Sequence, residues 1–202
     1  MADTPDTTKS PANTSMTEER LRAVTIGEPA RLNGPIYLAE YNPEWPRLFE
    51  ALACGIREAL GACALLLEHV GSTAVPGLAA KPILDLNLVV ADSSDKASYV
   101  PNLERIGYVL RIREPEWHER RLLKRASPNV NLHVFSRGSP ETERVLLFRD
   151  WLRAHDEDRA RYERTKRELA GREWSYVQDY ADAKSEVVEA ILVRAFAAQD
   201  AG

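Results

Sequence analysis

One stretch of the chain, residues 68–90, constrains the fold more than any other, because it places polar side chains on a strand that is otherwise apolar. It has the pattern of a strand, a loop of small residues beginning with Gly71-Ser72, and a second strand. Alternate side chains of a strand share a face, so Asp85 and Asn87 point to one side and their leucine neighbours to the other. Buried polar groups cost free energy unless something binds them. The pattern therefore predicts a binding or catalytic site on the polar face of the second strand.

The loop that begins at Gly71-Ser72 has the composition of a phosphate-binding turn. Glycine lets the backbone approach an anion closely, and exposed amides and the serine hydroxyl can donate hydrogen bonds to it. The loop is not a P-loop, because Pro76 occupies the second glycine position and Lys81 lies well beyond Gly77. A plain tight turn is the alternative interpretation, and Asp85 on the following strand favours phosphate binding.

Asp85 is the best candidate for a metal-binding carboxylate. Mg²⁺ prefers oxygen ligands and often binds one or two carboxylates together with substrate phosphates. In polymerase-type reactions, two metal ions hold the attacking and the leaving oxygens. A buried aspartate that accepts backbone hydrogen bonds is the alternative interpretation of the same residue.

The segment His69 to Asp85 reads HVGSTAVPGLAAKPILD. It closely resembles the hallmark of the GrpB family, His-x-Gly-Ser-Thr-x-x-Pro-Gly-Leu-x-Ala-Lys-Pro-x-x-Asp, and the resemblance runs from about Tyr41 to about Ala195. It implies the nucleotidyltransferase superfamily, with its Gly-Ser then Asp-x-Asp pattern, and an α/β fold whose core is a nucleotidyltransferase-like mixed sheet. It also implies an enzyme that uses a nucleoside triphosphate and Mg²⁺ or Mn²⁺ to modify an unidentified acceptor.

Asn87 departs from the superfamily pattern, because an active nucleotidyltransferase usually carries a second carboxylate there. The third acidic position has no obvious counterpart on a neighbouring strand, so Asn131 or His133 is the candidate for that place, and Glu68 could add a carboxylate. Either the reaction uses fewer metals, or the site binds a nucleotide or anion without classical transfer. On the first interpretation Asp85 and Asn87 are the metal ligands and, with His133, the catalytic residues.

His133 lies on a predicted strand and shares a face with Asn131. It is a candidate general base, ligand or phosphate contact, and a hydrogen-bonded core histidine is the alternative. The run Asn131-Leu132-His133-Val134 resembles a His-Leu-His-Val run that is common in the GrpB family. His69, at the lip of the motif, has the same two interpretations.

Lysines interrupt the apolar stripes of the C-terminal helices. Lys184 falls on the apolar stripe of a helix predicted over residues 173–197, and Lys166 has a similar position on the preceding helix. A lysine on an apolar face must find an anion or extend to water. The anion is either an internal acid, such as Asp150 or Asp182, or a ligand such as a triphosphate.

The helical half also carries short segments that resemble the GrpB family. Tyr180 to Lys184 matches its Tyr-x-x-Ala-Lys segment, and Arg149 matches the arginine of its Phe-Arg-Asp segment. The substrate- or nucleotide-binding residues implied by these and the earlier matches are His69, Gly71, Ser72, Lys81, Asn131, Arg149, Lys166, Tyr180 and Lys184.

Turn residues and periodicity predict a disordered leader over residues 1–18 and a single domain over residues 19–202. The domain is predicted to have a core sheet over about 36–135 and a helical segment over about 140–197. The expected strands are 36–38, 64–70, 83–90, 108–112, 121–125 and 130–135, the last two as a hairpin, and the expected helices are 42–60, 97–106, 140–154, 157–170 and 173–197.

Composition limits the partners of the protein. The net charge of −4 and the pI of about 5.7 weigh against non-specific nucleic-acid binding, which depends on basic surface. No apolar run approaches the roughly 20 residues of a membrane helix. Cys54 and Cys63 have no metal or disulfide spacing and fit a reducing cytoplasm. A nucleotidyltransferase-like enzyme is the leading hypothesis, and a ligase-type small-molecule enzyme and a non-catalytic nucleotide- or anion-binding accessory module are the alternatives.

Overall fold

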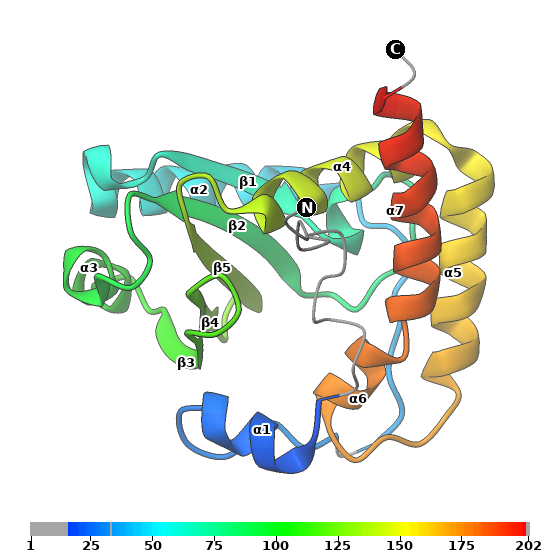
Figure 1. Ribbon diagram of the computed structural model, residues 1–202, viewed down its shortest axis with the longest axis horizontal. Helices are drawn as coiled ribbons and strands as arrows, with labels where there is room; N and C mark the ends of the chain where they lie inside the picture. The colour runs from blue at the N-terminus through cyan, green and yellow to red at the C-terminus, as the bar shows by residue number, and fades with distance from the viewer. Residues whose placement is uncertain (1–15, 33, 201–202) are drawn as a thin grey trace, which may run out of the picture.

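The centre of the molecule is a mixed five-stranded sheet (Figure 1). The computed structural model describes residues 16–32 and 34–200. The strands lie in the order β1-β2-β5-β4-β3, with β2 and β5 parallel and the other neighbours antiparallel. Their bounds are Leu66–Val70 for β1, Leu84–Val90 for β2, Val109–Glu114 for β3, Arg120–Arg125 for β4 and Val130–Ser136 for β5. The predicted α/β class with a mixed sheet is confirmed.

One face of the sheet carries the largest hydrophobic cluster. Strand β2 contributes Leu84, Leu86 and Leu88 to it, and their neighbours on β5 are apolar as well. Helices α2 (Glu44–Leu60) and α3 (Val100–Arg105) pack against this face. The strand pleat therefore turns the polar side chains of β2 and β5 to the opposite face.

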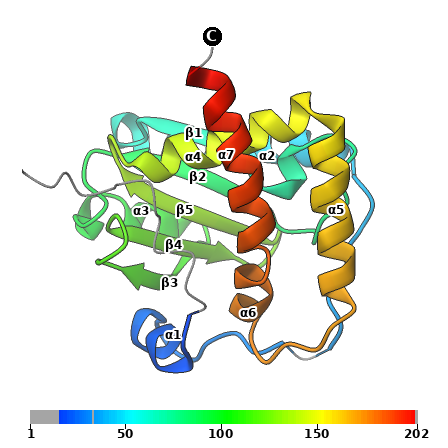
Figure 2. The same cartoon turned by 45° about the vertical axis from the view of Figure 1, so that its right-hand side comes forward.

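The C-terminal helices lie on the polar side and at one end of the sheet. In Figure 2, α4 and α7 pass in front of the strands, and in Figure 1 α5, α6 and α7 stand together beside the sheet. The bounds are Pro140–Ala154 for α4, Asp156–Ala170 for α5, Val177–Asp182 for α6 and Ser185–Asp200 for α7. The predicted helices over 140–154 and 157–170 are confirmed.

Local signals locate α2 and the β4–β5 hairpin well. The Asn42 side chain accepts the N–H of Glu44 at 2.9 Å, and the helix ends at Gly61, whose φ of 54° favours glycine. Strands β4 and β5 pair antiparallel across the short connection that the hairpin signal predicted.

The strand predicted over residues 36–38 is wrong. Residues 36–38 form no strand pairing, and the adjacent Ala39 makes an isolated bridge with Ala80. Ile36 instead packs in a small hydrophobic cluster with Tyr180. Side-chain burial, rather than a ladder of backbone hydrogen bonds, holds this part of the chain.

The single helix predicted over residues 173–197 is also wrong. It is divided into α6 and α7, and the break lies at Ala183 and Lys184. Helix α6 packs through Tyr180 in one hydrophobic cluster, whereas α7 packs through Ile191 in another. We attribute the break to this difference, because one straight helix would not bury Tyr180 and Ile191 in two separate clusters.

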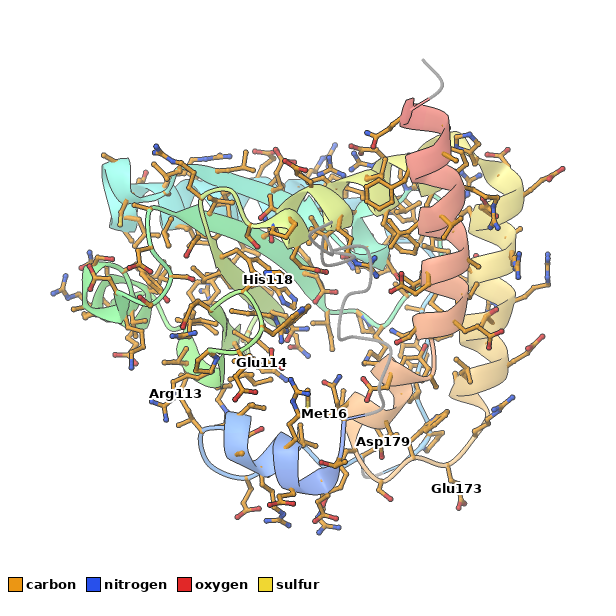
Figure 3. The ribbon with its side chains drawn as sticks, viewed as in Figure 1. Met16, Arg113, Glu114, His118, Glu173 and Asp179 are labelled. Atoms are coloured by element: carbon orange, nitrogen blue, oxygen red, sulfur yellow. The ribbon has the colours of Figure 1, made fainter. Side chains whose placement is uncertain are left out.

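The predicted leader over residues 1–18 lies outside the described residues as far as residue 15. Thr17 caps α1 (Glu18–Val24), a helix that the sequence pattern did not predict. Met16 lies beside α6, where its N–H donates to Asp182 at 2.7 Å (Figure 3). Within the described ranges, every helix is too short or too polar to span a membrane.

Candidate functional site

The parallel pairing of β2 with β5 brings the predicted polar residues together. Asp85 lies opposite Asn131 and Asn87 lies opposite His133 on one face. Asn131 Nδ2 donates to Asp85 Oδ1 at 2.8 Å, and His133 Nε2 lies 3.5 Å from the same oxygen. These residues come from strands that are distant in sequence, so the sheet order, and not the motif alone, creates the cluster.

Arg120 determines how His133 presents its ring to this cluster. Arg120 lies 3.0 Å from His133 Nδ1 and is also paired with Glu114. An arginine can only donate, so Nδ1 is the acceptor and the neutral ring carries its proton on Nε2, facing Asp85. Burial lowers the pKa of His133, although Asp85 acts in the opposite direction. Both ring nitrogens are thus engaged, and this arrangement does not favour the predicted role of His133 as a general base.

Gly71 and Asp85 are in close contact, which explains the glycine of the Gly-Ser pair. Gly71 has a φ of 69°, and a Cβ placed on it would lie 2.7 Å from Asp85 Oδ2. Burial alone would raise the pKa of Asp85, but hydrogen bonds from His133 and Asn131 and the charge of Lys184 lower it overall. Asp85 is therefore a carboxylate held between the loop and the sheet.

Lys166 ties helix α5 to the Gly-Ser loop. Lys166 is 2% exposed. Its ammonium group donates to Ser72 Oγ at 3.1 Å and to the carbonyl of Ala79, and lies 4.8 Å from the centre of the Tyr162 ring. Burial lowers the pKa of Lys166 to about 7. Lys166 lies on the inward face of α5, as its apolar stripe predicted, but its hydrogen-bond partners are neutral oxygens and not the expected acid.

Lys184 and Lys81 both lie over the ring of Tyr180, at 4.6 and 5.2 Å from its centre. The break between α6 and α7 places Lys184 here, and the end of the motif loop places Lys81. Burial lowers the pKa of Lys184, although the charge of Asp85 acts in the opposite direction. Burial and the nearby charge of Lys184 lower the pKa of Lys81 to about 8.

These groups line one cavity of about 230 Å³, which we call the basic cavity. Its charged lining residues are Lys81, Asp85, Arg120, Lys124, Lys166 and Lys184, together with the ring of His133. Asp85 is the one carboxylate among the described lining residues. In the part of the chain that the structure describes, none of the four lysines lies within 4.0 Å of a carboxylate oxygen. The cavity therefore has an excess of positive charge and is suited to an anion.

His69 does not reach the basic cavity. It pairs with Leu86 across the strands and lies on the apolar face, where it stacks on Phe49 with the ring centres 5.1 Å apart. Its Nε2 lies 3.0 Å from the hydroxyl of Thr73, and burial lowers its pKa to about 4. His69 is thus a neutral group that holds the loop, as in the alternative interpretation of a hydrogen-bonded core histidine.

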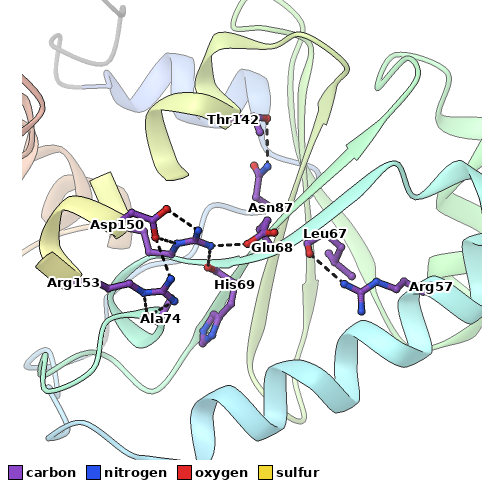
Figure 4. Close-up of polar contacts among 10 residues, drawn as sticks. Arg57, Leu67, Glu68, His69, Ala74, Asn87, Thr142, Asp150 and Arg153 are labelled. Carbon is purple, nitrogen blue, oxygen red and sulfur yellow. Dashed lines mark hydrogen bonds and ion pairs between the residues drawn. The ribbon is translucent and has the colours of Figure 1, made fainter. Parts of the chain in front are cut away.

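Arg149 also lies away from the basic cavity, and Figure 4 labels its partners Glu68, His69 and Asp150. It donates to Glu68 at 2.7 Å, to the carbonyl of His69 at 2.9 Å, and to Asp150. Arg153 adds two hydrogen bonds to the carbonyl of Ala74, at 3.0 and 2.8 Å. Two arginines of α4 thus fasten β1 and the motif loop, and Arg149 is not available to an anion in the cavity.

The donor set does not fit a magnesium ion held by the protein. Among the described residues there is no group of three histidine, cysteine or acidic side chains that could ligate a metal. Asp85 already accepts hydrogen bonds at Oδ1, and Asn87 binds Thr142 at 3.3 Å and lines a neighbouring cavity. The strand positions that would complete a carboxylate set hold Asn131 and His133.

Arg120 and Lys124 are site residues that the sequence analysis missed. Both lie on β4, where Lys124 pairs with Asn131 and shares the polar face. The predicted hairpin contained the necessary signal, because antiparallel pairing of its strands places alternate residues of 120–124 beside Asn131 and His133.

The structure defines an α/β protein with a positively charged cavity on the polar face of a mixed sheet. The chain belongs to the GrpB family, since the family model described as GrpB protein matches residues 35–194. A UPF0157 protein of Halalkalibacterium halodurans is 56% identical over 183 residues, which cover 91% of this chain and 94% of that protein. The crystal structure of conserved protein GrpB from Enterococcus faecalis is 28% identical, with a TM-score of 0.68, and the match covers 79% of this chain and 99% of that chain.

A solved poly(U) polymerase shows a more distant likeness. It is 10% identical with a TM-score of 0.39, over 72% of this chain and 49% of that chain. At this distance the likeness supports no argument about activity.

Proposed function

We propose that the basic cavity binds the phosphate groups of a small molecule such as a nucleotide. The observation that carries this proposal is the set of four lysines without a carboxylate partner in the described chain. A lysine charge that is removed from water without an anionic partner lowers the stability of the protein, and a bound anion offsets this loss. A polyphosphate supplies that compensation through several charge-assisted hydrogen bonds.

Each part of the cavity has a distinct role in this proposal. Lys81 comes from the end of the motif loop and Lys184 from the break between α6 and α7. Both bind phosphate oxygens as point charges beside the ring of Tyr180. Ser72 and Lys166 contribute a neutral and a cationic donor from the loop and from α5. Bound phosphate raises the pKa of the lysines, because it stabilises their charged forms. Asp85 keeps the loop and the sheet in place and repels a phosphate that approaches it.

Nucleotidyl transfer is the second candidate, and the ionised Asp85 beside the Gly71-Ser72 turn is the feature that favours it. The residues present do not form a set that would hold Mg²⁺ by themselves, and we derive no reaction step through the metal. A metal carried in by a nucleotide would still need Asp85 as its protein ligand. The two candidates therefore predict opposite effects of removing this carboxylate.

The experiment measures ATP and pyrophosphate binding by isothermal titration calorimetry, with Mg²⁺ and with EDTA. Anion binding predicts that both ligands bind in EDTA, and that Asp85→Asn binds them more tightly because a repulsive charge is lost. Lys184→Met should weaken binding by about tenfold or more, since one charged hydrogen bond is worth about 1.5–3 kcal/mol. Lys96→Met, outside the cavity, is the matched control.

Metal-dependent transfer predicts the reverse pattern. ATP would then bind only with Mg²⁺, and Asp85→Asn would weaken it. Failure of both ligands to bind under either condition would refute the proposed function.

A further inference from the structure

A second cavity of about 300 Å³ adjoins the basic cavity, and we call it the apolar chamber. The two cavities share Asp85, Arg120 and His133 in their linings. The apolar walls of the chamber come from β1, β5, α4 and α7 and include Val70, Phe135, Val145, Phe148, Val188 and Leu192. A single ligand could thus extend from the lysines, past the shared residues, into an apolar space.

The ionic groups of the chamber compensate one another. Arg144 lies 3.4 Å from Glu141 and also makes a bidentate pair with Glu189, with one distance of 3.1 Å. Burial raises the pKa of Glu141, which further reduces its tendency to carry charge. In contrast to the basic cavity, the chamber has no excess of cations and is suited to an uncharged group.

Two buried polar atoms of chamber-lining residues lack a partner in the described chain, Trp117 Nε1 and Asn87 Oδ1. The indole N–H is a donor, whereas the amide oxygen is an acceptor that a donor on a ligand would pair. Asn87 is 1% exposed, its Nδ2 donates to Thr142 at 3.3 Å, and its Oδ1 has no hydrogen bond. Turning the amide over would only exchange the unpaired atom, since Thr142 can serve one of the two. A buried acceptor without a partner costs about 1–3 kcal/mol, so a donor from a ligand would remove a real penalty.

We propose that the apolar chamber holds the organic part of the phosphate compound, an uncharged and largely apolar group that donates a hydrogen bond to Asn87 Oδ1. This inference rests on the proposed function, because the phosphate end is seated in the basic cavity. The ligand class is an ester of phosphate or diphosphate with an apolar or aromatic alcohol. Inorganic phosphate lacks the part that fills the chamber.

The test compares methyl phosphate, benzyl phosphate and 3-aminobenzyl phosphate by calorimetry on the full chain. Benzyl phosphate should bind at least about tenfold more tightly than methyl phosphate, because it buries an aromatic ring. The amino group should add severalfold in affinity, and Asn87→Leu should abolish that addition while keeping the gain from the ring.

Filling the chamber tests its location. Val145→Trp should remove the gain from the benzyl group, so that benzyl phosphate binds no more tightly than methyl phosphate does. Val193→Trp, on α7 but 67% exposed and outside the chamber, is the matched control. Val188→Phe fills the same space from α7 if the first variant does not fold.

The outcomes separate this inference from the proposed function. Equal affinity for methyl and benzyl phosphate would overturn the chamber as a binding site and leave the proposed function standing. A benzyl gain that survives Val145→Trp and Val188→Phe would overturn it as well. No binding of any of the three phosphates would overturn the inference, and the proposed function would be refuted with it only if ATP and pyrophosphate also fail to bind.

Discussion

Lys166 makes stability depend on pH in a way that can be worked out from its surroundings. Its pKa falls from an ordinary value of 10.5 to about 7 on burial. Between these values the folded protein binds fewer protons at this site than the unfolded chain does. Stability therefore rises with pH over this range. The cost of burying the charged lysine is largest near pH 7 and below, and it decreases as the pH rises toward 10.5.

The magnitude follows from the size of the shift. One pKa unit corresponds to about 1.4 kcal/mol, so the shift corresponds to about 5 kcal/mol over the whole range and about 2 kcal/mol between pH 7 and 9. Lys166→Met keeps the apolar stem and removes the titrating group. It also loses the hydrogen bonds to Ser72 and Ala79, which contribute about 1 kcal/mol each.

The assay is urea unfolding of the wild type and Lys166→Met at pH 7, 8 and 9. We expect the free energy of unfolding of the wild type, relative to that of the variant, to rise by about 2 kcal/mol between pH 7 and pH 9. Other titrating groups are common to both proteins, so the difference isolates Lys166. Parallel pH profiles would show that this lysine titrates normally, and the case for a buried cation in the basic cavity would fail.

Further predictions concern the motif loop and its supports. Gly71→Ala should destabilise the protein by about 1–3 kcal/mol more than Gly77→Ala in urea unfolding, because both have positive φ but only Gly71 contacts Asp85; equal losses would contradict the contact. Arg153→Met should cost about 1–2 kcal/mol in the same assay through the lost bonds to Ala74, and an unchanged midpoint would count against that role. The wild type should lose up to about 3 kcal/mol of stability relative to His69→Leu as the pH falls from 6.5 to 4, because the histidine binds a proton more tightly in the unfolded chain than in the folded protein. A difference in stability that stays constant with pH would disprove the lowered pKa.

Several parts of the site were predictable from local patterns. Strand alternation places Asp85 and Asn87 on one face and Asn131 and His133 on one face, and the structure has both pairs. The apolar stripe correctly placed Lys166 on the inward face of its helix, although it left open whether the lysine pairs with an anion or extends to water. These predictions depend only on backbone periodicity, which nearby residues determine.

Other parts were not predictable by the same means. The internal acids expected for the lysines, Asp150 and Asp182, have other hydrogen-bond partners. Asp150 pairs with Arg149, and Asp182 accepts from Gln178 and from the N–H of Met16. Lys184 lies at a helix break because the helices on its two sides pack in different clusters. The partner of a charged group and the direction of a helix both depend on contacts between segments that are distant in the sequence. The periodicity of a single segment gives no information about such contacts.

Local sequence patterns were sufficient to predict the motif loop, the polar face of its strand, the hairpin and the resemblance to the GrpB family. The packing of the elements determines that β5 lies parallel to β2, that β4 adds Arg120 and Lys124, and that lysines from four separate segments line one cavity. The physical reason is that the spacing of side chains along a strand or helix is a local property of the backbone. The excess of positive charge in the basic cavity instead depends on how those elements pack.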